Sequence, residues 1–308
     1  MNSETINNFD DEIDLKDLIL GLWKNKFLIL FIVLFSASIS VYYSLSLANT
    51  YTSKALLAPS DSEKSLSSKL SGYSALAGFA GISMPSSKAS KATEAIERIK
   101  SYDFFVNQFL PNVQLKDLIA ANDWQQNSNS IIYNNNIYNI KDNTWTREAS
   151  FPKTSMPSNQ EAYEVYKEIL SISEDKKTSF VTISITHVSP FIAKDWVDII
   201  ITNINAHMRE IDISIAENSI VFLKETLITT SLSDIRRAMA QLLQDQIQVL
   251  MLAEASQDYI FKPIVSPIAP EKKSAPSRAL ICILGTLIGF MISVLLSLYL
   301  HYSKKNKY

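Results

Sequence analysis

The sequence is poor in the residues that cross-link a chain, bind metals or break regular structure. Its single cysteine, Cys282, cannot form an intrachain disulfide. The three histidines are far apart in the sequence and have no cysteine at metal-ligand spacing, so no zinc-type cluster is indicated. Six glycines and ten prolines in 308 residues are few, which disfavours both a low-complexity chain and a turn-rich β-sandwich. We therefore predict a helix-rich α+β protein and expect no cofactor.

The sequence also lacks an excess of positive charge and any recognisable catalytic pattern. Lys and Arg together number 29 and Asp and Glu 31, a balance that argues against a nucleic-acid partner. The glycines of residues 60–90 are not followed by the Gly-Lys-Ser/Thr of a phosphate-binding loop, so a loop with some apolar anchors is the simpler interpretation. No nucleophile–base pair and no metal-ligand cluster stands out. We therefore predict a protein that is not an enzyme, with no catalytic, cofactor-binding or metal-binding residues.

What the sequence does have is one long apolar run near each end. Residues 279–300 carry no charge, and about twenty-two residues at roughly 1.5 Å each make a helix of about 33 Å, enough to cross a bilayer core. The other run, 27–47, follows Trp23, Lys24 and Lys26, an aromatic residue and two cations of the kind that anchor a helix at the membrane interface. Both runs are predicted to be transmembrane helices.

The flanking charges predict how the chain is oriented in the membrane. More cations precede the first span than follow it closely, so the N-terminus should be cytoplasmic. Two spans then give a cytoplasmic tail 1–26, an extracytoplasmic body 48–278 and a cytoplasmic tail 301–308. A cleaved signal peptide is the alternative for residues 27–47, but the long acidic leader and the length of the apolar run favour a retained anchor.

Within the body, periodicity predicts an α+β arrangement with a helical arm. Ser158 should begin a helix that runs to Ile172, with Glu161 in the capping-box position. His187 ends a predicted strand and is interpreted as an edge histidine. We also expect strands at 51–59, 180–187 and 259–265, a helix at 92–110 with a break near Ser101, and an irregular Asn-rich segment at 122–157. The arm should consist of two helices, at about 190–228 and 232–257, with Ser231 or Ser233 capping the second.

Two aromatic residues stand alone in the Asn-rich segment, Trp124 and Trp145. An aromatic side chain in a polar loop can stack on a sugar ring. Covering the edge of a core is the commoner use, and it is the interpretation we favour here.

Small residues recur at four-residue intervals in both spans. They are Ser36, Ser40 and Ser44 in the first span and Gly285, Gly289, Ser293 and Ser297 in the second. A face of small residues lets helix backbones approach closely inside lipid, so we predict helix packing there, in an oligomer or against another membrane protein. The alternative is that the alignment is accidental, because small residues are common in spans.

Four prolines precede the second span: Pro263 lies in the last predicted strand, and Pro267, Pro270 and Pro276 follow that strand. Proline fixes the backbone φ angle and cannot donate to a β-ladder. These prolines are therefore expected to confine the last strand to an edge or a strand end and to stiffen the return of the chain to the bilayer.

Several of these features together resemble the Wzz family of bacterial chain-length determinants, the polysaccharide co-polymerases. The resemblance is carried by the acidic motif 11–18 leading into Leu22-Trp23, by Ile96-Glu97-Arg98-Ile99-Lys100-Ser101, by Ser189-Pro190 at a helix start, and by the proline-rich stretch 267–276 before a glycine-containing span. It implies a bacterial inner-membrane protein whose periplasmic α/β base bears a helical arm.

The same resemblance implies ring-like homo-oligomers, commonly octamers, that act without catalysis. They would work with the O-antigen polymerase on a lipid-linked glycan and set the number of repeat units added. Two alternatives stay open at this point. The glycan could be enterobacterial common antigen or capsule, or the chain could be a membrane-anchored periplasmic export or binding adaptor.

Overall fold

The computed structural model describes residues 22–60 and 90–305. The chain divides into two units: Met1–Ala48 with Ala275–Tyr308, and Asn49–Ser274. The predictions for the N-terminal tail before Leu22, for the glycine-containing loop within 61–89 and for residues 306–308 lie outside the described residues.

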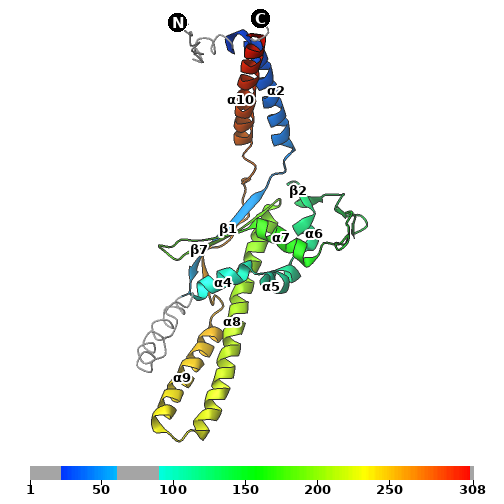
Figure 1. Cartoon of the computed structure of the whole chain (residues 1–308). Helices are drawn as coiled ribbons and strands as arrows, with labels where there is room; N and C mark the ends of the chain where they lie inside the picture. The colour runs from blue at the N-terminus through cyan, green and yellow to red at the C-terminus, as the bar shows by residue number, and fades with distance from the viewer. Residues whose placement is uncertain (1–21, 61–89, 306–308) are drawn as a thin grey trace, which may run out of the picture. The chain divides into compact units, whose positions relative to one another are not determined.

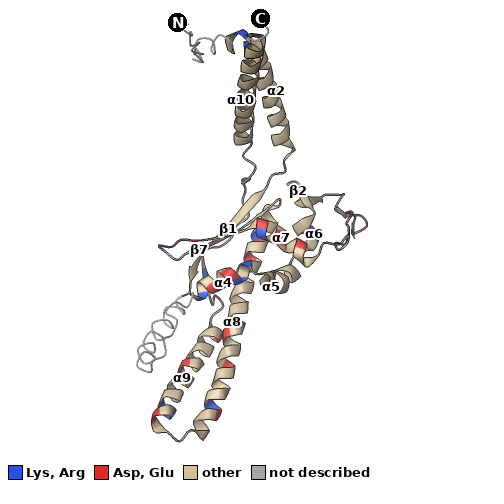
Figure 2. Ribbon diagram, in the orientation of Figure 1, with Lys and Arg blue, Asp and Glu red and all other residues tan. Residues whose placement is uncertain are grey.

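The first unit contains two long helices, α2 (Lys26–Ser46) and α10 (Arg278–Lys305), which lie side by side (Figure 1). Both are long and apolar enough to cross a membrane, with mean hydropathies of 2.1 and 2.7. Figure 2 shows Lys and Arg near the ends of the two helices and not along their lengths. The helices overlap the predicted spans 27–47 and 279–300, and α10 continues five residues further than expected, since it ends at Lys305 rather than residue 300.

The second unit is built on a four-stranded antiparallel sheet in the order β6-β7-β1-β8. The strands are β1 (Tyr51–Pro59), β6 (Leu170–Glu174), β7 (Val181–His187) and β8 (Phe261–Val265). With the helices described below, this sheet confirms the predicted α+β class. β8 lies at an edge of the sheet, where Pro263 is tolerated because an edge strand need not donate from every residue.

A series of short helices follows the undescribed segment and packs against two longer helices, α7 (Asn159–Ile169) and α8 (Pro190–Thr229). α4 (Lys91–Lys100) ends at Ser101, which breaks the helix as predicted, and α5 (Tyr102–Phe104) begins there with the Ser101 side chain accepting from the Phe104 N–H. The chain continues through a π-helical turn η1 (Phe105–Phe109), a 3₁₀ turn η2 (Leu110–Asn112) and α6 (Leu115–Ile119).

Aromatic side chains form much of the core beneath these helices. Phe105, Phe109 and Tyr166 are fully buried, with ring centroids 4.8–6.0 Å apart. The Tyr166 hydroxyl donates to the Ile99 carbonyl at 2.9 Å, which satisfies its polar end, and burial raises the pKa of Tyr166 well above its ordinary value. Leu57, Ile183 and other inward residues of β1 and β7 complete the core with α8.

The arm consists of α8 (Pro190–Thr229) and α9 (Ser233–Ala255), two helices packed side by side (Figure 1). Ser189 precedes Pro190 at the start of α8, as expected. Leu232 occupies the N-cap position of α9 and no side chain caps that helix, so the expectation that Ser231 or Ser233 would cap it is wrong.

Asn205 of α8 forms hydrogen bonds with the chain where it passes from the arm into the sheet. Its buried side chain accepts from the backbone N–H groups of Ile260 and Phe261, both at 2.9 Å, and donates to the Phe261 carbonyl, also at 2.9 Å. One side chain of α8 thus binds three backbone groups where the chain leaves α9 and begins β8.

The segment 122–157 is more ordered than predicted. It holds two small hairpins, β2 (Ala121–Gln125) with β3 (Ser130–Tyr133) and β4 (Tyr138–Asn139) with β5 (Thr144–Trp145). Asn129 and Asn143 adopt positive φ angles of 47° and 54°, so asparagines taken as a sign of irregular chain instead supply hairpin turns.

The structure also corrects the predicted end of the helix that starts at Ser158. α7 (Asn159–Ile169) has the predicted capping box between Ser158 and Glu161. It stops at Ile169 rather than Ile172, because Leu170–Glu174 pairs with β7 as a strand. Hydrogen bonds between β6 and β7 thus take the place of the last predicted helical turn.

His187 is not at a sheet edge, because β7 is an inner strand. Its ring is buried: Nε2 contacts the Asp117 carbonyl at 2.9 Å, and Nδ1 accepts from the Ser189 N–H at 3.0 Å. Burial lowers the pKa of His187 below its ordinary value, which favours the neutral ring.

Candidate functional site

The small residues of the two apolar helices face one another within the chain. A Cβ added to Gly285 would lie 1.8 Å from Ser40 Oγ and 2.7 Å from Ser40 Cβ. One added to Gly289 would lie 2.4 Å from Ser36 Cβ. The two glycines therefore allow the helix backbones to approach at the level of the two serines.

Polar contacts join the helices along this face. The Ser36 hydroxyl donates to the Gly285 carbonyl at 2.8 Å, and the Asn25 amide donates to the Ser297 carbonyl at 3.2 Å. The hydroxyls of Ser44, Ser293 and Ser297 are buried. All seven predicted packing residues thus lie on or near the surface that the two helices share.

The small-residue faces of α2 and α10 contact each other, which limits what else they can contact. The sequence predicted a surface for another subunit or another membrane protein, and in this chain the same surface is covered by the other helix. The outer surfaces of the two helices carry the exposed apolar side chains, including Phe31 and Phe35, whose rings stack at 6.4 Å. A role in contacts between proteins stays a prediction for the small residues.

The proline-containing segment after β8 runs beside the start of β1. Ser53 Oγ donates to the Ile268 carbonyl at 2.8 Å, and the Thr52 N–H donates to Ser274 Oγ at 3.0 Å. The Ser274 N–H in turn donates to the Thr50 carbonyl at 2.8 Å. Pro267 and Pro270 lie in this extended segment, and Pro276 follows it. Hydrogen bonds of side chains and backbone thus join the first and last residues of the body, a pairing that no local pattern predicts.

The isolated tryptophans pack against other aromatic residues. Trp124 contacts Tyr51 and Phe191, with ring centroids at 5.5 and 6.1 Å, and Trp145 contacts Tyr138 at 5.1 Å. This agrees with the core-edge interpretation favoured from the sequence over sugar stacking.

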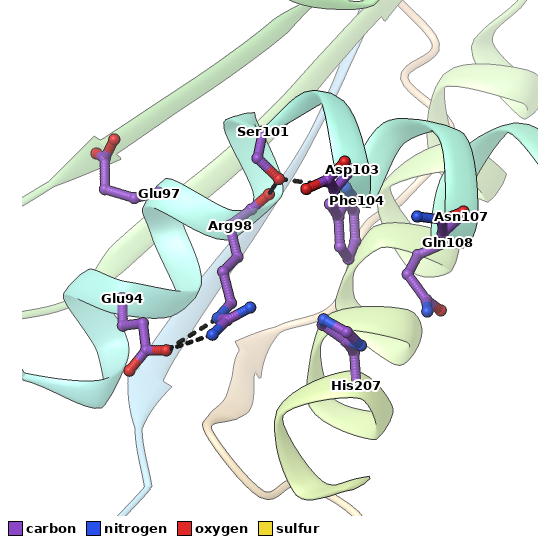
Figure 3. A pocket seen from close by; sticks show the side chains of 9 residues that line it. All are labelled: Glu94, Glu97, Arg98, Ser101, Asp103, Phe104, Asn107, Gln108 and His207. Carbon is purple, nitrogen blue, oxygen red and sulfur yellow. Dashed lines mark hydrogen bonds and ion pairs between the residues drawn. The ribbon is translucent and has the colours of Figure 1, made fainter. Parts of the chain in front are cut away.

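A surface hollow of about 390 Å³ lies between α4, the π-helical turn and α8 (Figure 3). Its lining includes three residues of the motif at 96–101, and the apolar residues of that motif, Ile96 and Ile99, are buried in the core. The nine lining residues are Glu94, Glu97, Arg98, Ser101, Asp103, Phe104, Asn107, Gln108 and His207.

Hydrogen bonds on α4 hold part of this lining in place. Arg98 Nε donates to Glu94 Oε1 at 2.9 Å, and a second guanidinium nitrogen lies 2.8 Å from the same oxygen. Ser101 Oγ donates to the Arg98 carbonyl at 2.7 Å.

His207 reaches the hollow from α8, 106 residues after Ser101 in the chain. Sequence reasoning treated His207 as isolated and had no signal that could have placed it here.

No group of three His, Cys, Asp or Glu residues that could hold a metal ion occurs within residues 22–60 and 90–305. Cys282 lies in α10 and is a free thiol.

Comparison with known proteins gives the family resemblance. The family model described as "Chain length determinant protein", Wzz, matches residues 11–108. No curated protein matches the chain. Among solved structures, a full-length bacterial polysaccharide co-polymerase is 15% identical with a TM-score of 0.40, covering 95% of this chain and 99% of that one. A fragment of WzzB, the polysaccharide co-polymerase from Salmonella Typhimurium, is 15% identical with a TM-score of 0.29, covering 74% of this chain and 100% of that one.

The matched residues contain two of the four features on which the resemblance was stated, the acidic motif 11–18 and the motif 96–101, whereas Ser189-Pro190 and the proline-rich stretch 267–276 lie outside them. They begin with the acidic motif before the first apolar helix, pass through that helix and β1, and end in the π-helical turn that lines the hollow. Over residues 11–108 the chain is similar to the Wzz chain length determinants, and the family resemblance read from its sequence is confirmed.

Proposed function

We propose that this protein regulates the chain length of a bacterial surface polysaccharide, namely the O-antigen of lipopolysaccharide, and that it does so without catalysing a reaction. The observation that carries the proposal is the Wzz family match over residues 11–108. The arrangement of the chain supports it, because an α+β body lies in the sequence between two helices able to cross a membrane.

We propose that the chain sits in the inner membrane with its body, residues 49–274, in the periplasm and both termini in the cytoplasm. The N-terminal end of α2 supports this orientation. Lys26 Nζ lies 5.4 Å from the centre of the Trp23 ring and 5.5 Å from that of Phe27, a cluster of a cation and aromatic rings suited to a membrane interface. Cations gathered before the first span favour the cytoplasmic side.

We further propose that the protein acts as a ring-like homo-oligomer with the O-antigen polymerase and its lipid-linked glycan. Two surfaces are available for such contacts. The outer faces of α2 and α10 expose large apolar side chains, and so does the arm, where Phe222, Ile228 and Leu232 are each more than 60% exposed. On the arm, which lies outside the proposed spans, exposed apolar side chains are typical of interaction sites. The apolar outer faces of α2 and α10 suit lipid or another membrane helix.

Deletion of the gene in the native strain, followed by a lipopolysaccharide ladder gel, tests the proposed function. The expected result is loss of the preferred O-antigen length while polymer is still made, with restoration by a plasmid copy of the full chain. A ladder unchanged by deletion would refute the O-antigen assignment. Loss of all polymer would instead point to a role in synthesis or export and would contradict a length regulator.

The proposal that the protein is not an enzyme has its own test. Purified full-length protein in detergent micelles is incubated with polysaccharide isolated from the parent strain, and the size distribution of the glycan is followed by gel filtration. An unchanged distribution is expected, and any cleavage or extension would contradict the proposal.

A further inference from the structure

We propose that the hollow lined by α4, the π-helical turn and α8 binds a short segment of an uncharged glycan. This inference rests on the proposed function, because it assigns a site on the same protein for the polymer whose length is regulated. The observations that support it are the shape of the hollow, the chemistry of its lining and the rigidity of its floor.

The hollow has the dimensions of a ligand site. Its volume of about 390 Å³ falls in the range of roughly 300–1,000 Å³ typical of small-molecule pockets. In Figure 3 the side chains of Arg98, Phe104, Gln108 and His207 gather around one space, while Glu97 projects away from them. The residues come from two segments far apart in the sequence, so the hollow forms only when α4 and α8 pack together.

The lining offers both donors and acceptors at its surface. Asn107 and Gln108 each present an amide, which donates and accepts, and His207 presents a ring whose two nitrogens can play either role. Asp103 adds a carboxylate acceptor. The accessible surface of the lining is mostly apolar, with these polar groups set in it. A sugar ring has hydroxyl groups at its rim, which donate and accept, and C–H groups on its faces, so it suits a lining of this kind.

The charges of the lining disfavour an anionic ligand. The carboxylates of Glu94 and Asp103 stand against the single guanidinium of Arg98, because Glu97 projects away from the space (Figure 3) and pairs with Lys100 at 2.9 Å. That guanidinium is already paired with Glu94 at 2.8 Å, so it is not a free anchor for a phosphate or an acidic sugar. An uncharged sugar meets no such repulsion.

The floor beneath the lining is rigid. Ile99, Phe104 and Phe105 are buried, and Ser101 bonds both the turn before it and the turn after it. The Gln108 carbonyl accepts from the amides of Asn112 and Asn203, which fixes the end of the π-helical turn. π-Helical turns often occur at functional sites, and a binding site works best when its supporting residues are already held in place.

Saturation-transfer NMR with the full-length protein in detergent micelles tests the proposal. The probe is a set of short oligosaccharides released from the surface polysaccharide of the parent strain, freed of lipid and separated into neutral and acidic fractions. The variants are Asn107→Ala and His207→Ala, and the matched control is Asn127→Ala, an exposed asparagine of the β2–β3 turn that is not among the residues lining the hollow. Thermal unfolding and gel filtration confirm that each variant folds and assembles as the parent does.

The wild-type protein and Asn127→Ala are expected to transfer saturation to the neutral oligosaccharides. Each lining variant is expected to bind about 5- to 10-fold more weakly, the change that follows from losing one hydrogen bond. No binding by the wild type, unchanged binding by both lining variants, or preference for the acidic fraction would overturn the proposal. So would a changed oligomer size in the lining variants, since the hollow would then be a subunit contact.

A ladder gel of the native strain carrying the same variants separates this inference from the proposed function. If the wild type binds no oligosaccharide but deletion still abolishes the preferred length, the site is wrong and the function stands. If deletion leaves the ladder unchanged, the proposed function fails whatever the binding result.

Discussion

Replacing Gly285 by alanine would place a methyl group where Ser40 already lies. The added Cβ would be 1.8 Å from Ser40 Oγ and 2.7 Å from Ser40 Cβ. Rotating the hydroxyl away would break its bond to the Ser36 carbonyl, at 2.9 Å, and would still leave the two Cβ atoms too close. The helices α2 and α10 must therefore move apart.

The size of the effect follows from two opposing terms. Inserting a methyl group into a packed interface costs about 1–3 kcal/mol. Alanine is favoured over glycine within a helix by up to about 1 kcal/mol, which offsets part of this cost. We expect Gly285→Ala to weaken association of the two helices by about 1 kcal/mol or more. The Ser36 bond to the Gly285 carbonyl lengthens when the backbones separate, which adds to the loss.

Ser40→Gly should rescue the variant. It removes both clashing atoms and leaves Ser40 Cα 3.9 Å from the new methyl group, an ordinary contact. The matched control is Ser38→Gly, which loses an equivalent hydroxyl bond to a carbonyl four residues earlier but lies on the exposed side of α2. In a double-mutant cycle we expect a coupling energy of about 1–3 kcal/mol between Gly285→Ala and Ser40→Gly, and none with Ser38→Gly.

The assay follows separation of the helix pair in the full chain. Cys282→Ser removes the native thiol, and Leu22→Cys and Tyr302→Cys introduce one labelling site on each side of the helix pair. Both sites lie close to the end where the Asn25 amide donates to the Ser297 carbonyl, and each cysteine carries a pyrene label. Excimer emission is then measured as SDS is titrated into detergent micelles. Additive effects of Gly285→Ala and Ser40→Gly, or rescue by Ser38→Gly as well, would refute the packing that this reasoning assumes.

Two further predictions concern the body. Asn205→Ala leaves three buried backbone groups at the start of β8 without their hydrogen-bond partner, which costs about 1–3 kcal/mol for each group. The thermal unfolding midpoint of the full chain should therefore fall sharply, and a midpoint within a degree of the parent would contradict this. Arg147 holds the pKa of Glu161 at about 2, below the ordinary 4.5, so this ion pair stabilises the fold above pH 4.5 and is lost as pH falls toward 2. Urea unfolding at several pH values should therefore show Arg147→Met less stable than the parent at pH 7, with a gap that narrows below pH 4.5; a gap independent of pH would exclude the pairing as its cause.

Local patterns in the sequence predicted most of the individual elements. The alternation in residues 181–187 and the capping box of Ser158 and Glu161 depend on near neighbours, and both were recognised from spacing alone. The break at Ser101 also depends on near neighbours, since the Ser101 side chain caps α5. So does the start of α8, where Pro190 suits the first helical position, although the Ser189 side chain makes no capping bond.

The errors occurred where distant residues decide the outcome. Residues 170–172 continue a helical pattern in isolation, but pairing with β7 makes them a strand. His187 was placed at an edge because the strand order could not be known, and the order β6-β7-β1-β8 puts it inside.

The sequence by itself determined the two apolar helices, the α+β class and the resemblance to Wzz chain length determinants, since composition, periodicity and short motifs are local properties. Only the tertiary structure decided what these parts contact. It put the small residues of α2 against those of α10, because glycine at 285 and 289 leaves room for serine at 40 and 36. It also brought His207 of α8 to the polar residues of α4, because burial of Ile96 and Ile99 in the core turns the other side of α4 toward solvent.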